Sequence, residues 1–278
     1  MLKKIEKEFK HRLDIIYTRD ESSVLFKMII SFLIRDNINN IVNKELSESQ
    51  LINFDQFTTQ LLAHQPIQYV LGEADFYHIK FKVNRDVLIP RPETEELVYL
   101  IICEQSNKEV TVLDIGTGSG CIPIALKKNL PLAQICAIDI SESALVLANE
   151  NAILNKAEVI FSKADALNLV SSEWSQFDVI VSNPPYIAQS EMEMMEENVK
   201  SHEPHLALFV DDDEPLIFYD KIGDFALSNL KLGGTLYFEI NQQLAKETAD
   251  ILMKKGFTTT IIKDINQNDR ILKAQLLG

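Results

Sequence analysis

The chain has 278 residues, 46% of them hydrophobic, so it is long enough for one large domain or two smaller ones with a substantial core. Its formal net charge of −14 weighs against a sequence-independent nucleic-acid binder, because such a protein needs a basic stripe against the phosphates. No apolar run reaches membrane-spanning length, since the run Met28–Ile34 contains Ser31 and is followed by Arg35. These properties agree with a soluble globular protein and weigh against DNA as its partner.

The N-terminus and the cysteines indicate the compartment. Residues 1–8 are charged and lack an apolar core, so they do not resemble a signal peptide. Cys103, Cys121 and Cys136 are odd in number and lie in apolar stretches, which is typical of reduced packing residues. We therefore expect a cytoplasmic protein without membrane association, and a monomer.

Residues 1–70 contain no glycine, and Pro66 is their only proline. Apolar residues recur there at helical spacing, which predicts a small helical bundle, with a helix beginning after Ser47. The apolar positions that indicate it are Val24, Phe26, Met28, Phe32, Leu33, Ile38, Ile41 and Val42. We treat residues 1–70 as a separate helical domain.

Residues 71–91 form the predicted linker. Ile79, Phe81 and Val83 alternate with polar residues, a pattern that predicts a β-hairpin. A helix is expected to open at Pro92, because proline suits the first helical position and the acids that follow suit the positive end of the helix dipole.

From residue 109 to the end, strand patterns alternate with helical patterns. This alternation predicts an α/β fold with a doubly wound, mostly parallel, seven-stranded sheet over residues 92–278. The expected strands are 110–115, 133–139, 157–162, 177–182, 235–240, 257–263 and 270–275, and the expected helices are 121–129, 142–152, 216–230 and 242–255.

A glycine loop follows the first of these strands. The stretch Val112–Gly120 reads D-x-G-x-G-x-G, whereas a dinucleotide-binding loop needs glycine at its sixth place, which is Cys121 here. The loop therefore suits a ligand without a pyrophosphate. Asp139 ends the next strand, about twenty residues on, where a carboxylate accepts hydrogen bonds from ribose hydroxyls. The alternative is that Asp139 only caps the helix that follows it.

Asn183-Pro184-Pro185-Tyr186 follows the strand 177–182. Prolines carry no N–H, so this segment offers carbonyl oxygens and the Asn183 side-chain oxygen as acceptors, beside the flat face of Tyr186. Such a cradle suits a planar NH₂ group. The alternative is a rigid turn, since Asn and Pro are common turn residues.

The glycine loop, the acid that ends the next strand and N-P-P-Y together resemble the class I S-adenosylmethionine methyltransferases that act on NH₂ groups. A second block is similar to the linker of the release factor glutamine methyltransferases, the PrmC/HemK family. This block comprises Gln68–Gly72, Phe76 and Val87–Glu95, and Glu203-Pro204, Ala207-Leu208 and Asp269-Arg270 add to the likeness. Asn241 departs from it, because the family usually has glycine there.

The resemblance implies a Rossmann-like class I methyltransferase fold and S-adenosyl-L-methionine as cofactor. The implied cofactor-binding residues are Asp114, Gly116, Thr117, Gly118, Ser119, Gly120, Asp139, Asp165, Ala166 and Asn183. The implied catalytic and substrate-binding residues are Asn183, Pro184, Pro185 and Tyr186, with Arg91 and Glu93 also binding substrate. The implied substrate is the glutamine of the Gly-Gly-Gln loop of a peptide chain release factor free of the ribosome. Because every cofactor feature lies after residue 109, we expect residues 1–70 to recognise this protein substrate.

Two other interpretations stay open. One is methylation of a ribosomal-protein glutamine or of a DNA adenine amino group, and the other is a binding module without activity. For catalysis, we expect the Asn183 oxygen and the Pro184 carbonyl to accept the two amide protons, with Tyr186 against the amide plane. Neither a general base nor a metal is expected.

Other segments are assigned ordinary structural roles. The acidic, methionine-rich stretch 191–197 is either a mobile lid or a turn of surface helix, and we favour the helix. His202 and His205 are separated by Pro204, which argues against metal binding on a helix. The acids at 211–214 suggest a solvated turn, and Trp174 is expected to pack.

Overall fold

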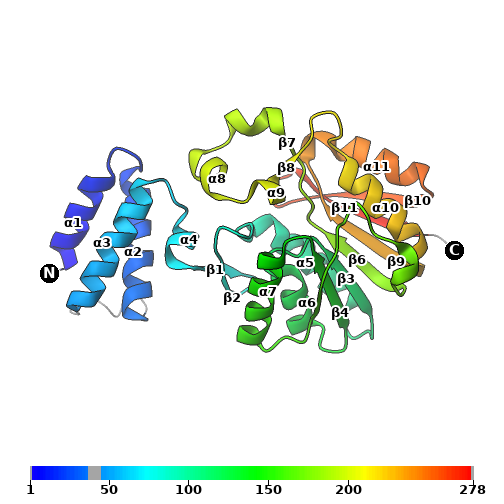
Figure 1. Cartoon of the computed structure of the whole chain (residues 1–278), viewed down its shortest axis with the longest axis horizontal. Helices are drawn as coiled ribbons and strands as arrows, with labels where there is room; N and C mark the ends of the chain where they lie inside the picture. Colours follow the sequence, from blue (N-terminus) through cyan, green and yellow to red (C-terminus); the bar gives the residue numbers. More distant parts are fainter. Residues whose placement is uncertain (1, 37–44, 277–278) are drawn as a thin grey trace. The chain divides into compact units, whose positions relative to one another are not determined.

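The computed structural model describes residues 2–36 and 45–276 of the chain (Figure 1). Its contacts divide the chain into two compact units. The helical unit comprises Met1–Glu73 and Glu196–His202, and the α/β unit comprises Ala74–Met195 and Glu203–Gly278. Among the described residues, no helix is long and apolar enough to cross a membrane.

The helical unit contains α1 (Leu2–Leu13), α2 (Arg19–Ile34), α3 (Glu48–Leu62), α4 (Ile67–Leu71) and α8 (Glu197–His202). The prediction that a helix begins after Ser47 is confirmed, because the Ser47 hydroxyl accepts from Gln50 N and the Gln50 side chain accepts from Ser47 N. Three rings, Phe9, Phe26 and Phe54, bring α1, α2 and α3 together at centroid distances of 5.4–5.8 Å.

The buried face of α2 differs from the one that the apolar spacing suggested. Leu25, Phe26, Ile29 and Ile30 form it, whereas Val24 is 55% exposed. A helix rotates by about 100° per residue, so the residue beside a buried one can face solvent. Ile38, Ile41 and Val42 lie outside the described residues.

The predicted hairpin is present as β1 (Glu73–Phe76) and β2 (Ile79–Lys82). Phe76 and Phe81 turn inward and meet edge to face at 6.0 Å. Lys82 exchanges two hydrogen bonds with the Asn151 side chain, its N–H donating to Oδ1 at 2.7 Å and its carbonyl accepting from Nδ2 at 3.0 Å. From Ala74 onward the hairpin therefore belongs to the α/β unit.

A seven-stranded sheet in the order β10-β11-β9-β6-β3-β4-β5 forms the centre of the α/β unit. β11 is antiparallel to both its neighbours, and the other neighbouring pairs are parallel, which confirms the predicted doubly wound, mostly parallel sheet. The strands are β3 (Thr111–Ile115), β4 (Gln134–Asp139), β5 (Ile160–Lys163), β6 (Phe177–Ser182), β9 (Leu230–Glu239), β10 (Phe257–Lys263) and β11 (Asp269–Leu276).

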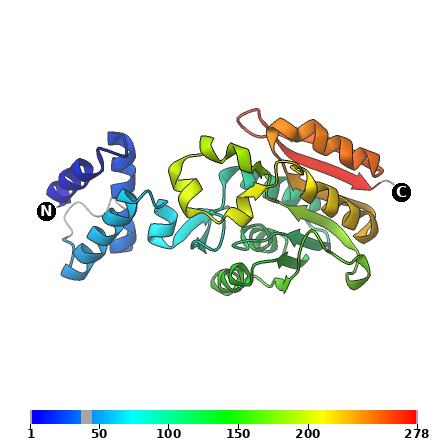
Figure 2. The same ribbon diagram turned by 45° about the horizontal axis from the view of Figure 1, so that its top comes forward.

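Helices cover both faces of this sheet, as Figures 1 and 2 show. Alternate strand residues point to opposite faces, so Val112 packs in one core and Leu113 in the other. The first core includes α5 (Pro92–Gln105), α6 (Cys121–Asn129) and α7 (Glu142–Asn155), and the second includes α10 (Ile217–Asn229) and α11 (Ala245–Lys254). The predicted start of a helix at Pro92 is confirmed.

Register aligns the ends of the parallel strands. Ile115 pairs with Ile138 of β4 and with Ser182 of β6, and Ser182 pairs with Phe238 of β9. The residues that come next are Asp139, Gly116, Asn183 and Glu239, so these four lie side by side at the carboxyl edge. The strand order reverses between β3 and β6, which is where doubly wound sheets bind ligands.

Several short elements connect the larger ones. β7 (Ile187–Ala188) and β8 (Phe209–Val210) form a small parallel pair that the sequence did not predict. The stretch 191–197, favoured as a surface helix, overlaps the 3₁₀ helix η3 (Gln189–Met194) and ends at the first residue of α8. The acids 211–214 include an exposed turn, and Trp174 packs edge to face on Phe225. Other short helices in the described part of the chain are η2 (Ser171–Glu173), α9 (His205–Leu208) and η4 (Gln242–Leu244).

Candidate active site

The glycine loop joins β3 to α6 and has a backbone that side chains disfavour. Gly116, Gly118 and Gly120 have φ angles of 79°, 52° and 80°, all in the left-handed region. At Gly120 a Cβ atom would also lie 3.1 Å from Ile124 Cδ1 and 3.2 Å from Ala148 Cβ. Glycine is therefore required there both for the turn and for the close packing of α6 against α7.

Asp139 is hydrogen-bonded to the backbone on both of its oxygens. Gly118 N donates to Oδ2 at 2.8 Å, and Ser141 N donates to Oδ1 at 2.9 Å. The cap of α7 is Ser141, whose hydroxyl accepts from Ala144 N. The interpretation of Asp139 as only a helix cap is therefore wrong, because this carboxylate links the glycine loop to the end of β4.

Asp114 lies at the base of the glycine loop with no exposed surface. Neither of its carboxylate oxygens has a hydrogen-bond partner among the described residues. Burial raises the pKa of Asp114 to about 7, the charge of Asp139 adds to this effect, and the nearby Thr117 hydroxyl offsets part of it. A buried carboxyl without a partner is costly, and such costs are typical of functional sites.

A cavity of about 390 Å³ opens at this edge of the sheet. Ten of the predicted site residues line it: Arg91, Gly116, Thr117, Gly118, Ser119, Asp139, Asp165, Ala166, Asn183 and Pro185. Its lining also includes Val87–Pro90, Leu206, Ala207 and Phe218, which sequence reasoning did not assign. The cavity is thus apolar over much of its wall, with the acids and the amide gathered at the strand ends.

The remaining predicted site residues lie around this cavity without lining it. Asp114, Gly120 and Pro184 are buried, and Glu93 is half-buried in the first turn of α5. Tyr186 lines a second cavity of about 290 Å³ together with Met194, Asn241 and Arg270. Burial is the main cause that raises the pKa of the Tyr186 phenol, so it stays neutral.

Asn183 is half-buried at the cavity wall, and its Nδ2 donates to the Thr94 hydroxyl at 3.3 Å.

Asn241 also has a defined role, because its Nδ2 donates to the Tyr186 carbonyl at 3.2 Å and its Oδ1 accepts from Gln243 N. Its φ of −67° is ordinary for any residue, so the absence of glycine at this position causes no strain.

Arg91 was expected to bind substrate, and the structure gives it an ion pair. Its Nη2 donates to Glu203 Oε1 at 2.6 Å, and the Glu203 side chain is only 1% exposed. Ile89 N also donates to Glu203, at 3.4 Å. The pair fixes the loop that walls the cavity, and Glu203 is a residue to which sequence reasoning gave no role.

Asp165 accepts from Leu167 N at 2.9 Å and from the Asn168 side chain at 2.7 Å, as an ordinary loop aspartate does, yet it also lines the cavity.

Cys121 lines the cavity too, but burial raises its pKa to about 12, so its thiol is inert. Among the described residues, no group of three or more His, Cys, Asp or Glu side chains could hold a metal.

Comparison with known proteins agrees with this geometry. Residues 98–208 match the family model described as a methyltransferase small domain. The crystal structure of a methyltransferase from Pyrococcus furiosus matches 81% of this chain and 100% of that chain, with a TM-score of 0.54 and 17% identity, which is a likeness of fold. The sheet and the glycine loop at its carboxyl edge thus define a class I methyltransferase.

Relatives of nearly the same length narrow the class. The release factor glutamine methyltransferase of Flavobacterium psychrophilum is 44% identical over 98% of both chains. The protein of the same name from Bacteroides thetaiotaomicron is 40% identical over 98% of this chain and 99% of its own. The chain belongs to the release factor glutamine methyltransferase family, as the motifs indicated.

Proposed function

We propose that this protein transfers a methyl group from S-adenosyl-L-methionine to the side-chain amide nitrogen of the glutamine in the Gly-Gly-Gln loop of peptide chain release factors. The observation that carries the proposal is the alignment of the Gly116 loop, Asp139 and Asn183 along one edge of the sheet, around one cavity. The names of the two relatives supply the substrate class.

The residues at this edge fit the proposed cofactor. Both Asp139 oxygens keep lone pairs beyond the single backbone bond that each accepts, and these suit the two ribose hydroxyls. Asp165 and Ala166 line the part of the cavity proposed for the adenine, and the buried, unpartnered Asp114 carboxyl lies at the base of the loop. When bound, the cofactor supplies a methyl group activated by its attachment to a sulfonium.

The chain contributes positioning and charge. A glutamine amide nitrogen is a poor nucleophile because its lone pair is delocalised into the carbonyl. The Asn183 oxygen and the Pro184 carbonyl accept the two amide protons, which turns the nitrogen toward the cofactor and stabilises positive charge as it grows there. The methylated nitrogen is acidic and releases its proton to water, so no dedicated base is needed.

The helical unit is proposed to recognise the protein substrate, because every residue that lines the cofactor cavity lies in the α/β unit. The net charge of −14 favours a protein partner over DNA. The ribosomal-protein and adenine alternatives share the same Asn183 chemistry and differ only in the partner surface. The intact glycine loop and the lined cavity weigh against a binding module without activity.

Mass spectrometry of candidate substrates tests the proposal. The protein is incubated with isotope-labelled S-adenosylmethionine and a purified release factor, and tryptic peptides are sequenced. We expect a single added methyl group on the glutamine of Gly-Gly-Gln, absent from a release factor whose glutamine is replaced by alanine. Label on ribosomal protein or DNA adenine with none on the release factor would replace this function with an alternative.

A further inference from the structure

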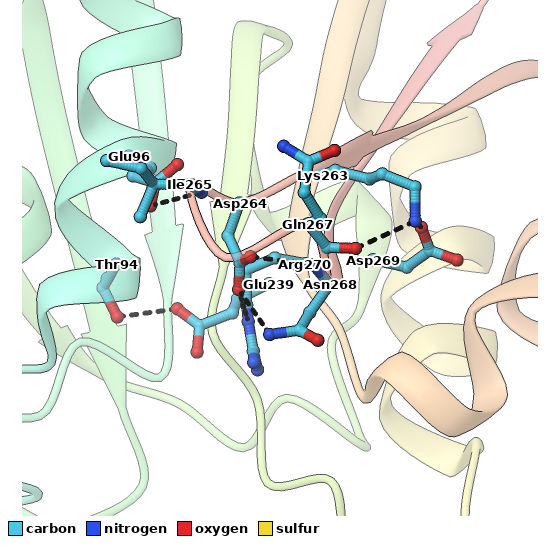
Figure 3. A network of polar contacts seen from close by, with 10 residues as sticks. All are labelled: Thr94, Glu96, Glu239, Lys263, Asp264, Ile265, Gln267, Asn268, Asp269 and Arg270. Atoms are coloured by element: carbon cyan, nitrogen blue, oxygen red, sulfur yellow. Dashed lines mark hydrogen bonds and ion pairs between the residues drawn. The ribbon is translucent and has the colours of Figure 1, made fainter.

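At the cavity wall, Asn183 is joined to Thr94, which also lines the cavity, and through Thr94 to the buried Glu239; both come from distant parts of the chain. Asn183 Nδ2 lies 3.3 Å from the Thr94 hydroxyl, and that hydroxyl donates to Glu239 Oε2 at 2.6 Å. Thr94, in the first turn of α5, is 3% exposed, and Glu239, the last residue of β9, is 2% exposed. Figure 3 shows the Thr94–Glu239 bond beside the Arg270 network.

The direction of these hydrogen bonds fixes the direction of the Asn183 amide. A threonine hydroxyl has one proton, and an ionised carboxylate can only accept. The Thr94 proton therefore goes to Glu239, and Thr94 can offer Asn183 only a lone pair. Asn183 must meet it with its NH₂ group, which leaves the Asn183 oxygen on the other side of a planar amide, available to a substrate.

The 2.6 Å distance from the Thr94 hydroxyl to Glu239 Oε2 is typical of a hydroxyl that donates to an ionised carboxylate. Burial is the main cause that raises the pKa of Glu239, and the negative charge of Glu93 adds to this rise. The Thr94 hydroxyl and the positive charges of Arg270 and Arg91 offset part of it. Arg270 is itself held by Asp264, whose Oδ2 lies 3.4 Å from its Nε (Figure 3). Were Glu239 neutral, it could donate to Thr94, and the Thr94 proton would be free to turn to the Asn183 oxygen.

We propose that Thr94 and Glu239 are positioning residues of the methyl transfer. They hold the Asn183 amide in the one orientation that presents its oxygen to the substrate amide. This inference rests on the proposed function for its activity readouts only. A reversed Asn183 would present NH₂ to a substrate NH₂, so donor would face donor and the substrate nitrogen would lose its acceptor.

Kinetics of matched variants test the proposal. Thr94→Val removes the hydroxyl at nearly constant volume, and Thr94→Ser keeps it. As a control, Thr248→Val removes a buried hydroxyl of α11 that lies away from Asn183 in the sequence and donates to Leu244 O at 2.8 Å. For Thr94→Val we expect about a 10- to 100-fold fall in kcat with KM for both substrates within about threefold, because lost orientation acts on the reacting geometry. Thr94→Ser should recover most of kcat, and Thr248→Val should keep it.

Glu239→Gln supplies the second arm. A glutamine can donate as well as accept, so Thr94 is no longer obliged to direct its proton away from Asn183. We expect a fall in kcat of the same order as for Thr94→Val, with the cofactor dissociation constant from calorimetry unchanged. Wild-type kcat in either Thr94→Val or Glu239→Gln would overturn the proposal. So would equal losses of kcat in Thr94→Ser and Thr94→Val, because packing would then be the cause.

A spectroscopic readout separates this inference from the proposed function. In protein labelled with ¹⁵N-asparagine, the Asn183 NH₂ signal is identified by its absence in Asn183→Asp. We expect slowed exchange of one of its protons in wild type and loss of that protection in Thr94→Val, whatever substrate the enzyme uses. Fast exchange of both protons in the wild type would remove the Thr94 contact and with it the proposal.

Discussion

The backbone N–H of Gly118 donates a 2.8 Å hydrogen bond to the carboxylate of Asp139, twenty-one residues further along the chain. The acid that is proposed to hold the cofactor ribose thus also holds the shape of the loop around that cofactor. Loss of this side chain removes two contributions together, a ligand for the cofactor and a brace for the glycine loop.

Asp139→Ala should weaken S-adenosylmethionine binding by about 10- to 100-fold, because a hydrogen bond to a charged group contributes roughly 1.5–3 kcal/mol. Asp139→Asn keeps one acceptor oxygen and should lose less. Titration calorimetry measures both, with Glu142→Ala, which only breaks an exposed pair with Lys163, as the control. Wild-type affinity in Asp139→Ala would remove Asp139 from the cofactor site.

Asn183→Ala should slow single turnover at saturating cofactor by ~10²–10³, since it removes a preorganised acceptor for the reacting amide. Asn183→Asp should retain partial activity, because it keeps an oxygen while its charge competes with Glu239 for the one Thr94 proton. Tyr186→Phe should be mild, and Tyr186→Ala severe, because the ring face is what packs. Quenched-flow measurement of the methylated product gives the single-turnover rate of each variant. Near-normal turnover in Asn183→Ala would leave N-P-P-Y a structural turn.

Arg91→Met should lower the free energy of unfolding by about 3 kcal/mol, because it leaves the Glu203 carboxylate buried and unpaired. Glu203→Gln should cost less, and adding it to Arg91→Met should recover part of the loss. Urea denaturation measures these differences. Arg12→Met is the matched control, because its pair with Asp55 is more exposed, and it should change stability by less than about 1 kcal/mol. Equal effects of Arg91→Met and Arg12→Met would contradict the importance of burial.

The buried Asp114 carboxyl should make the ligand-free protein less stable as pH rises. Its folded pKa of about 7 exceeds the ordinary 3.8, so the folded state holds the proton more tightly. The resulting stabilisation is full below about pH 4 and is lost as pH rises through 7, by about 4 kcal/mol at most. Asn cannot ionise, so the thermal unfolding temperature of Asp114→Asn should rise relative to that of the wild type between pH 5 and pH 8. A constant difference across that range would contradict the raised pKa.

Deletion of residues 1–65 should spare cofactor binding and slow methylation of an intact release factor. The cavity proposed for the cofactor is lined by residues of the α/β unit, whereas substrate recognition is proposed for the helical unit. A short Gly-Gly-Gln peptide is the control substrate, and its rate should change little. Full activity of the shortened protein on the intact release factor would show that the helical unit is not needed for recognition.

The parts of the fold predictable from sequence are those with local causes. Alternating apolar residues and helical spacing predicted all seven strands and four of the helices, although β5 begins at Ile160 and not at 157, and β9 begins at Leu230 and not at 235. Ser47 marked a helix start through contacts three residues away. The glycine loop and the N-P-P-Y segment follow adjacent strands, so their meeting at one edge follows from the order of a doubly wound sheet.

Contacts between distant residues could not be predicted in the same way. Thr94 and Glu239 are 145 residues apart, and nothing near either residue specifies the other. Arg91 and Glu203 are 112 residues apart, and the charge of Arg91 alone suggested a substrate contact as readily as an ion pair. The short pair β7–β8 has too few residues to show a periodic pattern.

The helix α8 belongs to the helical unit although residues on both sides of it belong to the α/β unit, so the chain passes between the units three times. His202 of α8 contacts the Ala63 carbonyl at 2.8 Å, next to the end of α3. A gene fusion that exchanged only the first 73 residues would pair α8 with a foreign neighbour. Under the proposed recognition by the helical unit, a new substrate specificity would be grafted onto this enzyme only by transplanting residues 1–73 and 196–202 together.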